Sequence, residues 1–226
     1  MLALVRLLQL ASPALPVGAY TYSQGLEWVV EAGEVRTEND VAAWLGDLLE
    51  FSVGSFEAPM VLAMIEAWQR GETSEIARLN DDFLASRETA ELRAETVQMG
   101  YSLVRLLTEL HGYTDLPQWR ERLLAIDDAA FPTAWSAAAA AWQIPCGMAL
   151  PAYLWAWLEN QVMAAVKVVP LGQQAGQRLL ATLGERIPTI AARAGALPEA
   201  EWNNFTPGLA LASSRHETQY TRLFRS

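Results

Sequence analysis

Residues 148–169, MALPAYLWAWLENQVMAAVKVV, decide the fold, because they are apolar on nearly every side at helical spacing. A helix without a polar face has to be surrounded by other elements, so this stretch predicts a central buried helix. It is no membrane span, since its charge-free run from Met148 to Leu158 is shorter than the ~20 residues that a bilayer requires. The chain therefore needs a shell of further elements.

Amphipathic stripes before and after this stretch predict that the shell is helical. Apolar residues recur at steps of three and four over 41–51, 60–68 and 99–110. Pro59 stands at the expected start of the second of these helices and Gly71 at its expected end. Thr37 and Asp40 stand at capping-box spacing before the first stripe, with Asp in place of the usual Glu. No alternating run bounded by tight-turn residues indicates a strand. We predict an all-α, single-domain bundle of roughly eight to ten helices.

Composition excludes several classes of function. The net charge of −10 among 226 residues argues against nucleic acid, which requires a basic surface. Cys146 is the only cysteine, as expected in a reducing compartment, and the N-terminus makes a poor signal peptide because Arg6 and Gln9 interrupt it. We therefore expect a cytoplasmic protein without a membrane anchor. The hydrophobic fraction of 52% and nine Trp residues favour a partner that covers part of the surface.

The final stretch, SSRHETQYTRLFRS (213–226), is typical of a docking segment. It holds three arginines against one acid, together with Tyr220 and Phe224, and Tyr and Arg dominate interface hot spots. The turn-forming residues 195–208 before it predict a loop that detaches it from the bundle and lets it reach outward. We thus divide the chain into a helical bundle, 1–210, and a partner-docking tail, 211–226.

Three other places carry unusual residues. The turn SPALPVGAYTYSQGLE (12–27) interrupts the helical pattern and is either folded onto the core or an aromatic contact surface. Lys167 is the only lysine and lies in an apolar run, so it either snorkels to water or meets an anion, with Glu27 as a candidate. Residues 86–95, SRETAELRAE, are either a solvated helix face with Arg87–Glu91 pairing or a docking face.

Catalytic and metal-binding motifs are missing from the sequence. His216 and Glu217 begin an HExxH pattern, but Tyr220 stands where its second histidine belongs. Cys146, His111 and His216 alone cannot form a closed transition-metal site. No phosphate-binding loop or nucleophile elbow is present. We predict that the chain is not an enzyme and holds neither a metal nor a cofactor of its own.

The same unusual stretches carry a resemblance to a known family. LASPALPVGAYTYSQGLEW near the start, SRETAELRAE, KVVPLGQQAGQRLL and the terminal SSRHETQYTRLFRS resemble the UreF family of urease accessory proteins, in the family's order. The resemblance implies an all-helical, homodimeric chaperone and scaffold that is not itself an enzyme. It implies a complex with UreD (also called UreH), the nickel-carrying GTPase UreG and apo-urease. Within that complex the protein would regulate the GTPase during nickel insertion, so that nickel cation binding is expected of the assembly.

The resemblance also assigns roles to residues. The tail positions are expected to dock on UreD: Arg215, His216, Glu217, Gln219, Tyr220, Arg222, Phe224 and Arg225. The opening motif and the lone lysine are expected to communicate with the GTPase: Tyr20, Tyr22, Ser23, Gln24, Glu27 and Lys167.

Two alternative hypotheses stay open at the level of sequence. The first is a helical ligand- or cofactor-binding enzyme that uses the apolar centre around Trp155, Trp157 and Lys167. The second is direct nickel binding by a dimer through paired Cys146 or His216.

Overall fold

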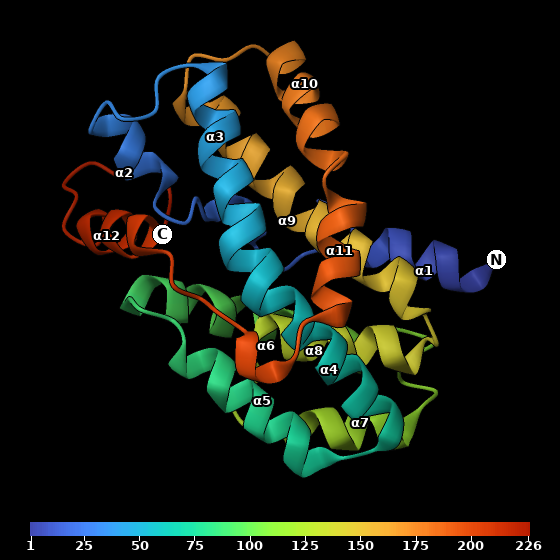
Figure 1. Ribbon diagram of the computed structural model, residues 1–226. Coiled ribbons are helices and arrows are strands. Elements are labelled where there is room, and N and C mark those ends of the chain that lie inside the picture. Colours follow the sequence, from blue (N-terminus) through green and yellow to red (C-terminus); the bar gives the residue numbers. More distant parts are fainter.

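Helix α9 (Cys146–Val168) runs through the middle of the molecule, but it is not buried on every side as the opening stretch predicts, because Met148, Trp155 and Met163 are 39%, 37% and 39% exposed. The computed structural model describes residues 1–226, and α9 packs in it against α4, α10 and α11 (Figure 1). Pro151 lies inside α9 and removes one backbone hydrogen bond without ending the helix.

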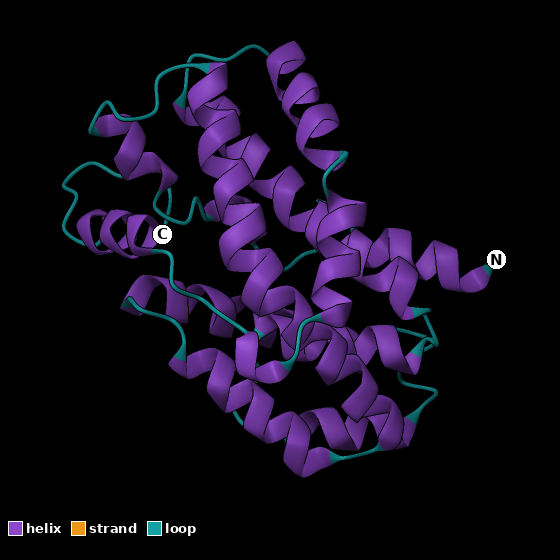
Figure 2. Ribbon diagram, in the orientation of Figure 1, coloured by secondary structure: helices purple, strands orange, loops and turns teal.

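The remaining elements are also helical, and no strand is present (Figure 2). In chain order they are α1 (Leu2–Leu10), η1 (Ala19–Thr21), α2 (Leu26–Glu31), α3 (Glu38–Leu48), η2 (Leu49–Glu57), α4 (Ala58–Arg70), α5 (Thr73–Ala85), α6 (Ala90–Glu109), α7 (Pro117–Leu124), α8 (Phe131–Ala141), then α9, α10 (Gln173–Gly184), α11 (Ile187–Ala196), η3 (Glu199–Glu201) and α12 (Pro207–His216). The prediction of an all-α, single-domain bundle is confirmed. So is the capping box, because the side chains of Thr37 and Asp40 each accept a backbone N–H of the other residue.

The segments α3, η2 and α4 form one continuous helix, which the sequence did not reveal. Pro59 was expected to open a new helix, but η2 is a π-helical stretch that leads directly into α4. Gly71 ends the long helix as predicted, with a left-handed φ of 73°. The helix Glu38–Arg70 is long and apolar enough to cross a membrane, yet 61% of its apolar window is buried inside the protein. A core helix of a soluble protein has the same properties.

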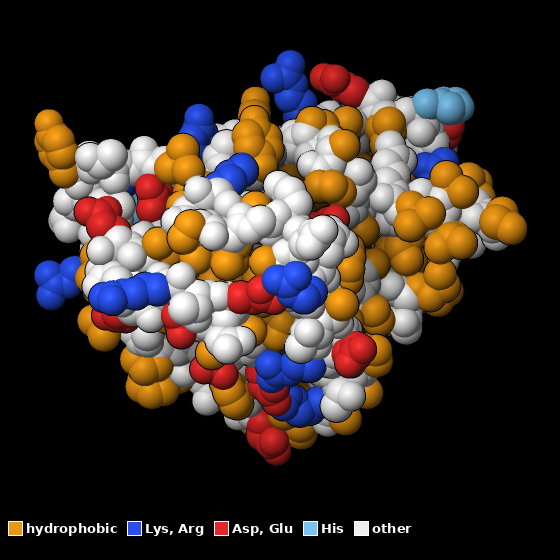
Figure 3. Space-filling model, turned by 90° about the horizontal axis from the view of Figure 1, so that it is seen from above, with side chains coloured by type: hydrophobic (Ala, Val, Ile, Leu, Met, Phe, Trp, Pro, Cys, Tyr) orange, Lys and Arg blue, Asp and Glu red, His pale blue; other side chains and the backbone are white.

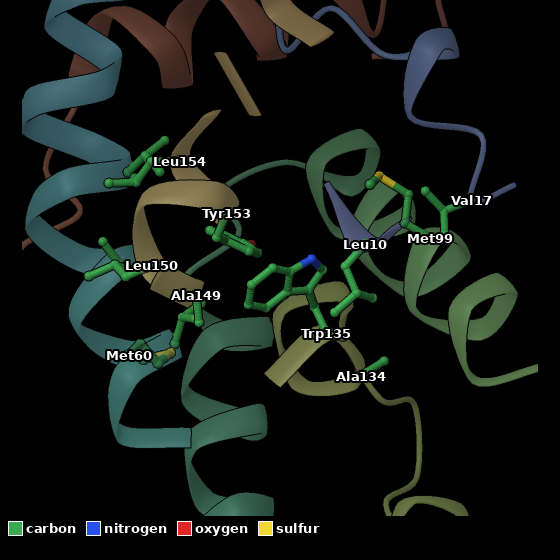
Figure 4. Close-up of a cluster of buried hydrophobic side chains, with 14 of the residues drawn as sticks. Leu10, Val17, Met60, Met99, Ala134, Trp135, Ala149, Leu150, Tyr153 and Leu154 are labelled. Carbon is green, nitrogen blue, oxygen red and sulfur yellow. The ribbon is translucent and has the colours of Figure 1, made fainter. Parts of the chain in front are cut away.

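The core is centred on Trp135 of α8, which is completely buried (Figure 4). Its ring meets that of Tyr153 from α9 edge-on, with the ring centres 5.0 Å apart. Met60 of α4 and Leu10 of α1 belong to the same apolar cluster, so the first helix of the chain is fixed to the centre at its far end. The opposite end of α1 projects from the bundle, where apolar side chains gather on the surface (Figure 3).

Gly100 controls the contact between α6 and α8. A Cβ at this position would lie 1.9 Å from the carbonyl oxygen of Ala129, and backbone cannot move aside as a flexible side chain can. We expect Gly100→Ala to lower the free energy of unfolding by about 1–3 kcal/mol, as overpacking does. Gly195→Ala is the matched control, since its Cβ would meet only Leu62 at 3.7 Å. Urea denaturation that finds Gly100→Ala as stable as Gly195→Ala would contradict this account of the contact.

Candidate functional site

Three stretches that lie far apart in sequence meet on one side of the bundle: the turn before α2, the start of α6, and the tail after α12. Ser23 donates its backbone N–H to the carbonyl of Ser226 at 2.8 Å, and Arg225 donates its own to the carbonyl of Thr21 at 2.8 Å. Thr89, which caps α6, lies 2.7 Å from the hydroxyl of Ser213. The tail therefore folds back between the other two stretches (Figure 1).

The expectation that residues 195–208 let the tail reach outward is wrong. Asn204 donates to the carbonyl of Ser86 at 3.0 Å, and Asn203 donates its backbone N–H to that of Ser55 at 3.1 Å. These bonds tie the loop to η2 and to the residues before α6. The loop is therefore held against the bundle, and the tail follows it there.

Glu27 on α2 holds the last turn of the tail. Its carboxylate accepts the backbone N–H groups of Leu223 at 2.7 Å and Phe224 at 2.8 Å. Ring nitrogen Nε2 of His216 lies 3.3 Å from the same carboxylate. Because Glu27 is buried, these donors replace the water that its carboxylate has lost. Phe224 is thereby fixed with its ring in the apolar core.

His216 and Glu91 connect the tail to α6. The ring of His216 is fully buried, and its Nδ1 lies 2.6 Å from a carboxylate oxygen of Glu91. The other oxygen of Glu91 accepts from Nη1 of Arg222 at 2.6 Å. An imidazole can donate to Glu27 and Glu91 together only when both of its nitrogens carry protons. The backward turn of the tail therefore depends on polar groups brought together from α2, α6, α12 and the tail itself.

Glu95, one turn further along α6, completes this carboxylate cluster of Glu27, Glu91 and Glu95. It accepts from the amide of Gln24 at 2.8 Å and from the hydroxyl of Ser226 at 2.7 Å. Burial raises the pKa of the Glu95 carboxyl to about 7, although both hydrogen bonds act to lower it. The Glu95 carboxyl therefore keeps its proton up to a higher pH than an ordinary glutamate does.

The arrangement coincides with the stretches that carry the resemblance, and comparison with known proteins agrees. A model of the UreF family matches residues 35–184. The chain belongs to the UreF family of urease accessory proteins. It is 71% identical over 226 residues to the urease accessory protein UreF of Azoarcus sp. (strain BH72), covering 100% of this chain and 97% of that relative. It is 60% identical over 225 residues to that of Dechloromonas aromatica (strain RCB), covering 100% of this chain and 98% of the relative.

The tail residues that are predicted to dock on UreD fall into a buried group and an exposed group. His216 and Phe224 are buried, and Gln219 is half-buried with its amide on Glu31. The remaining predicted docking residues lie on the surface: Arg215, Glu217, Tyr220, Arg222 and Arg225. The side chain of Tyr220 has no cover at all, at 101% relative exposure. Only this second group is accessible to a partner while the tail is folded back.

The residues predicted to face the GTPase divide in the same way. Tyr22, Ser23 and Glu27 are buried beneath the tail, whereas Tyr20 and Lys167 are exposed next to each other. Lys167 donates to the carbonyl of Tyr20 at 3.4 Å, and its ammonium lies 5.4 Å from the ring centre of Phe224. Gln24 is half-buried and bridges Trp157 and Glu95. The buried members thus connect the exposed pair to the tail.

Two interpretations of charged residues are corrected by these contacts. Glu27 does not pair with Lys167, because the tail occupies its carboxylate. Arg87 pairs with Glu57 at 3.7 Å, and Glu91 with the tail, so residues 86–95 are not simply a solvated face. The sequence did contain a pattern that indicates burial of Glu95. Glu95 lies four residues before Met99, which lies four residues before Leu103, so all three are on the same apolar face of the helix.

The exposure of Lys167 and the burial of His216 argue against parts of the two alternative hypotheses. Lys167 is exposed, so it cannot serve as a desolvated amine inside an apolar centre. The buried His216 cannot meet a second copy while the tail is in place. No group of three or more His, Cys, Asp or Glu is arranged to hold a metal ion.

The burial of Glu95 makes a prediction about pH. Its folded-state pKa, near 7, lies above the ordinary value of 4.5, so folding favours the protonated form. The contribution of protonated Glu95 to the free energy of unfolding is therefore complete below about pH 4.5. It is lost as the pH rises through about 7, and the loss is ~3 kcal/mol at most. Glu95→Gln stays neutral at every pH. The free energy of unfolding of the wild type should therefore fall relative to Glu95→Gln between pH 5 and pH 8.

Urea denaturation of both proteins across this range measures the difference. Glu75→Gln is the control, because Glu75 lies on α5, away from the tail. A constant difference between wild type and Glu95→Gln would show that Glu95 titrates as an ordinary carboxyl.

Proposed function

We propose that this protein is a cytoplasmic scaffold in urease maturation, which joins UreD (UreH) and the GTPase UreG and regulates GTP-dependent nickel insertion into apo-urease. One observation supports the proposal above the others. Three of the segments in which the chain resembles its family, the opening turn, residues 86–95 and the tail, are held together by the carboxylates of Glu27, Glu91 and Glu95. Nickel is cargo in this proposal, and its binding belongs to the assembly.

The chain is proposed to consist of a bundle, 1–210, and a docking tail, 211–226. The UreD-docking surface is proposed to be the outer side of this tail. Tyr220, Leu223 and Arg222 project from it; Glu27 holds the backbone N–H of Leu223, and Glu91 holds the guanidinium of Arg222. A rigid surface binds with less entropic loss than a free peptide does. The buried His216 and Phe224 would act here by supporting the exposed residues.

The GTPase-facing surface is proposed to be the exposed pair of Tyr20 and Lys167, supported by Tyr22, Ser23, Gln24 and Glu27. The pair lies next to the tail, because the ammonium of Lys167 faces the ring of Phe224 as well as that of Tyr20. A shift of Phe224 on UreD docking would change the surroundings of Lys167. The two partners would thus sense each other through one aromatic ring.

A homodimer is proposed to form through α1. Leu2, Val5 and Leu8 on its outer face are 65%, 56% and 63% exposed, while Leu7 and Leu10 on the inner face are buried. An apolar helix face of this kind is expected to be covered by a partner. A second copy of the chain would cover this face, because the same apolar face is present on both protomers of a two-fold dimer.

Separate pull-downs against UreD and UreG test the two surfaces. Tyr220→Ala should weaken UreD capture about tenfold or more, as loss of an interface tyrosine does, and leave direct UreG capture unchanged. Lys167→Ala should weaken UreG capture and spare UreD. Tyr101→Ala is the matched control, since Tyr101 is 61% exposed on α6 outside both surfaces. Equal effects of the two variants on both partners would contradict the division into two surfaces.

A charge on α1 tests the dimer. Val5→Arg should reduce the mass in light scattering to the protomer's 24.9 kDa, because an arginine would be buried without a partner. Leu124→Arg is the control, since Leu124 is 51% exposed on α7. A wild type that is monomeric at every concentration, or a Val5→Arg protein that remains dimeric, would place the contact elsewhere.

A further inference from the structure

The imidazole of His216 lies between two carboxylates at the centre of the folded-back tail. Its ring is completely buried, so bulk water does not reach either nitrogen. Nδ1 lies 2.6 Å from Oε2 of Glu91 on α6, and Nε2 lies 3.3 Å from Oε2 of Glu27 on α2. Both contacts are possible because α12 runs between α2 and the start of α6 (Figure 1). Each ring nitrogen therefore faces a hydrogen-bond acceptor.

Three of the four carboxylate oxygens around His216 accept from other donors as well. Both oxygens of Glu27 accept backbone N–H groups of the tail, and Oε1 of Glu91 accepts from Arg222. An ionised carboxylate only accepts hydrogen bonds, whereas a neutral imidazole has one N–H group and one bare nitrogen. A neutral ring would therefore turn a lone pair toward one of the two carboxylates. Only the imidazolium, with a proton on each nitrogen, donates to both.

The charges around the ring also favour this second proton. The charged and titratable groups on the elements packed around it are Glu27 from α2, Glu91 and Glu95 from α6, Arg215 and Glu217 from α12, Arg222 from the tail and Lys167 from α9. Arg215, Glu217 and Lys167 are exposed, so water and salt screen their charges. Next to the ring, the largely buried carboxylates of Glu27 and Glu91 face one guanidinium. A second positive charge, on His216, balances the two carboxylates.

We propose that His216 makes the folded-back tail a proton-linked latch, which holds the tail while both ring nitrogens are protonated and releases it more readily as the pH rises. A histidine in water is half-protonated near pH 6.5, so a detached tail has mostly lost this proton at higher pH. Folding the tail back then requires the uptake of one proton. The state that binds more protons is disfavoured as the pH rises. Above about pH 6.5 the detached fraction should therefore increase by up to about tenfold per pH unit.

The latch lies beneath the residues that are proposed to contact UreD. Glu91 holds the guanidinium of Arg222, and Glu27 holds the backbone N–H of Leu223, so the same two carboxylates fix both His216 and the exposed side of the tail. A detached tail loses this fixed surface. Capture of UreD should then weaken as the pH rises, a consequence that rests on the proposed docking function.

Nitrogen-15 NMR of the wild-type full chain at about pH 7.5 detects the proton directly, because it distinguishes an imidazolium from a neutral ring with one bare nitrogen. His216 should have two protonated nitrogens. His111, whose side chain is 94% exposed, should have a neutral ring in the same spectrum. A bare nitrogen on His216 would overturn the proposal without any substitution.

Hydrogen exchange of the Leu223 and Phe224 amides measures detachment, because both are bound to Glu27 in the folded-back tail. The ratio of each exchange rate to that of an unstructured peptide gives the detached fraction. The measurement uses Glu95→Gln, since burial raises the pKa of Glu95 to about 7 and its titration would overlap. In this protein the ratio should rise about five- to tenfold between about pH 7 and pH 8.

Two further substitutions in the Glu95→Gln protein assign the rise to His216. His216→Gln is neutral at every pH and should abolish the rise, whatever it does to the absolute rates. His111→Gln removes the other histidine of the chain and should leave the rise unchanged. A ratio that does not change with pH in Glu95→Gln, or that rises equally in His216→Gln, would overturn the latch.

Capture of UreD at about pH 6.5 and about pH 8 separates the latch from the scaffold function. The wild type should capture less UreD at the higher pH than at the lower, and His216→Gln should show a smaller difference. Failure to capture UreD at either pH would contradict the docking function and leave the exchange result standing. Capture of UreD together with exchange that is independent of pH would overturn the latch alone.

Discussion

The carboxylate of Glu27 is the group on which the arrangement of the chain ends depends. It is buried on a two-turn helix near the start of the sequence, and its partners lie about two hundred residues later: two backbone N–H groups and the ring of His216. A buried carboxylate without such donors would be costly, and a tail without this acceptor would have no reason to turn back. The N-terminal turn, α6 and the tail are therefore one structural unit, although the sequence separates them.

Patterns of neighbouring residues predicted most helices of the fold, but they did not predict the π-helical stretch η2. The capping box of Thr37 and Asp40, the stop at Gly71 and the helical conformation of α9 were predictable because each depends on a few neighbouring residues. The π-helical η2 was not, because a π-helix satisfies the backbone where an ordinary helix would have ended before Pro59. Its geometry places Glu57 against Tyr153, a contact that only the tertiary fold defines.

The sequence identified most residues of the candidate site, but it did not predict which of them contact one another. The tail and the opening turn stood out by composition, which indicates contact but not with what. Part of that contact is internal: Phe224 fills the core and His216 binds two carboxylates of the same chain. Arginines and aromatic residues at a chain end can thus serve the fold and a partner together. Sequence alone does not separate these uses, because both require large side chains with directional hydrogen bonds.

The strength of the tail's attachment constrains how a partner can use it. Hydrogen bonds to a charged group contribute about 1.5–3 kcal/mol each, so the three donors on Glu27 together represent about 4–9 kcal/mol if they act independently. A micromolar complex has about 8 kcal/mol of binding free energy in total. A partner that had to pull the tail free would lose most of its affinity to that step. Docking on the folded-back tail avoids the loss, which is why the exposed Tyr220, Arg222 and Leu223, rather than the buried His216 and Phe224, are the side chains expected to touch UreD.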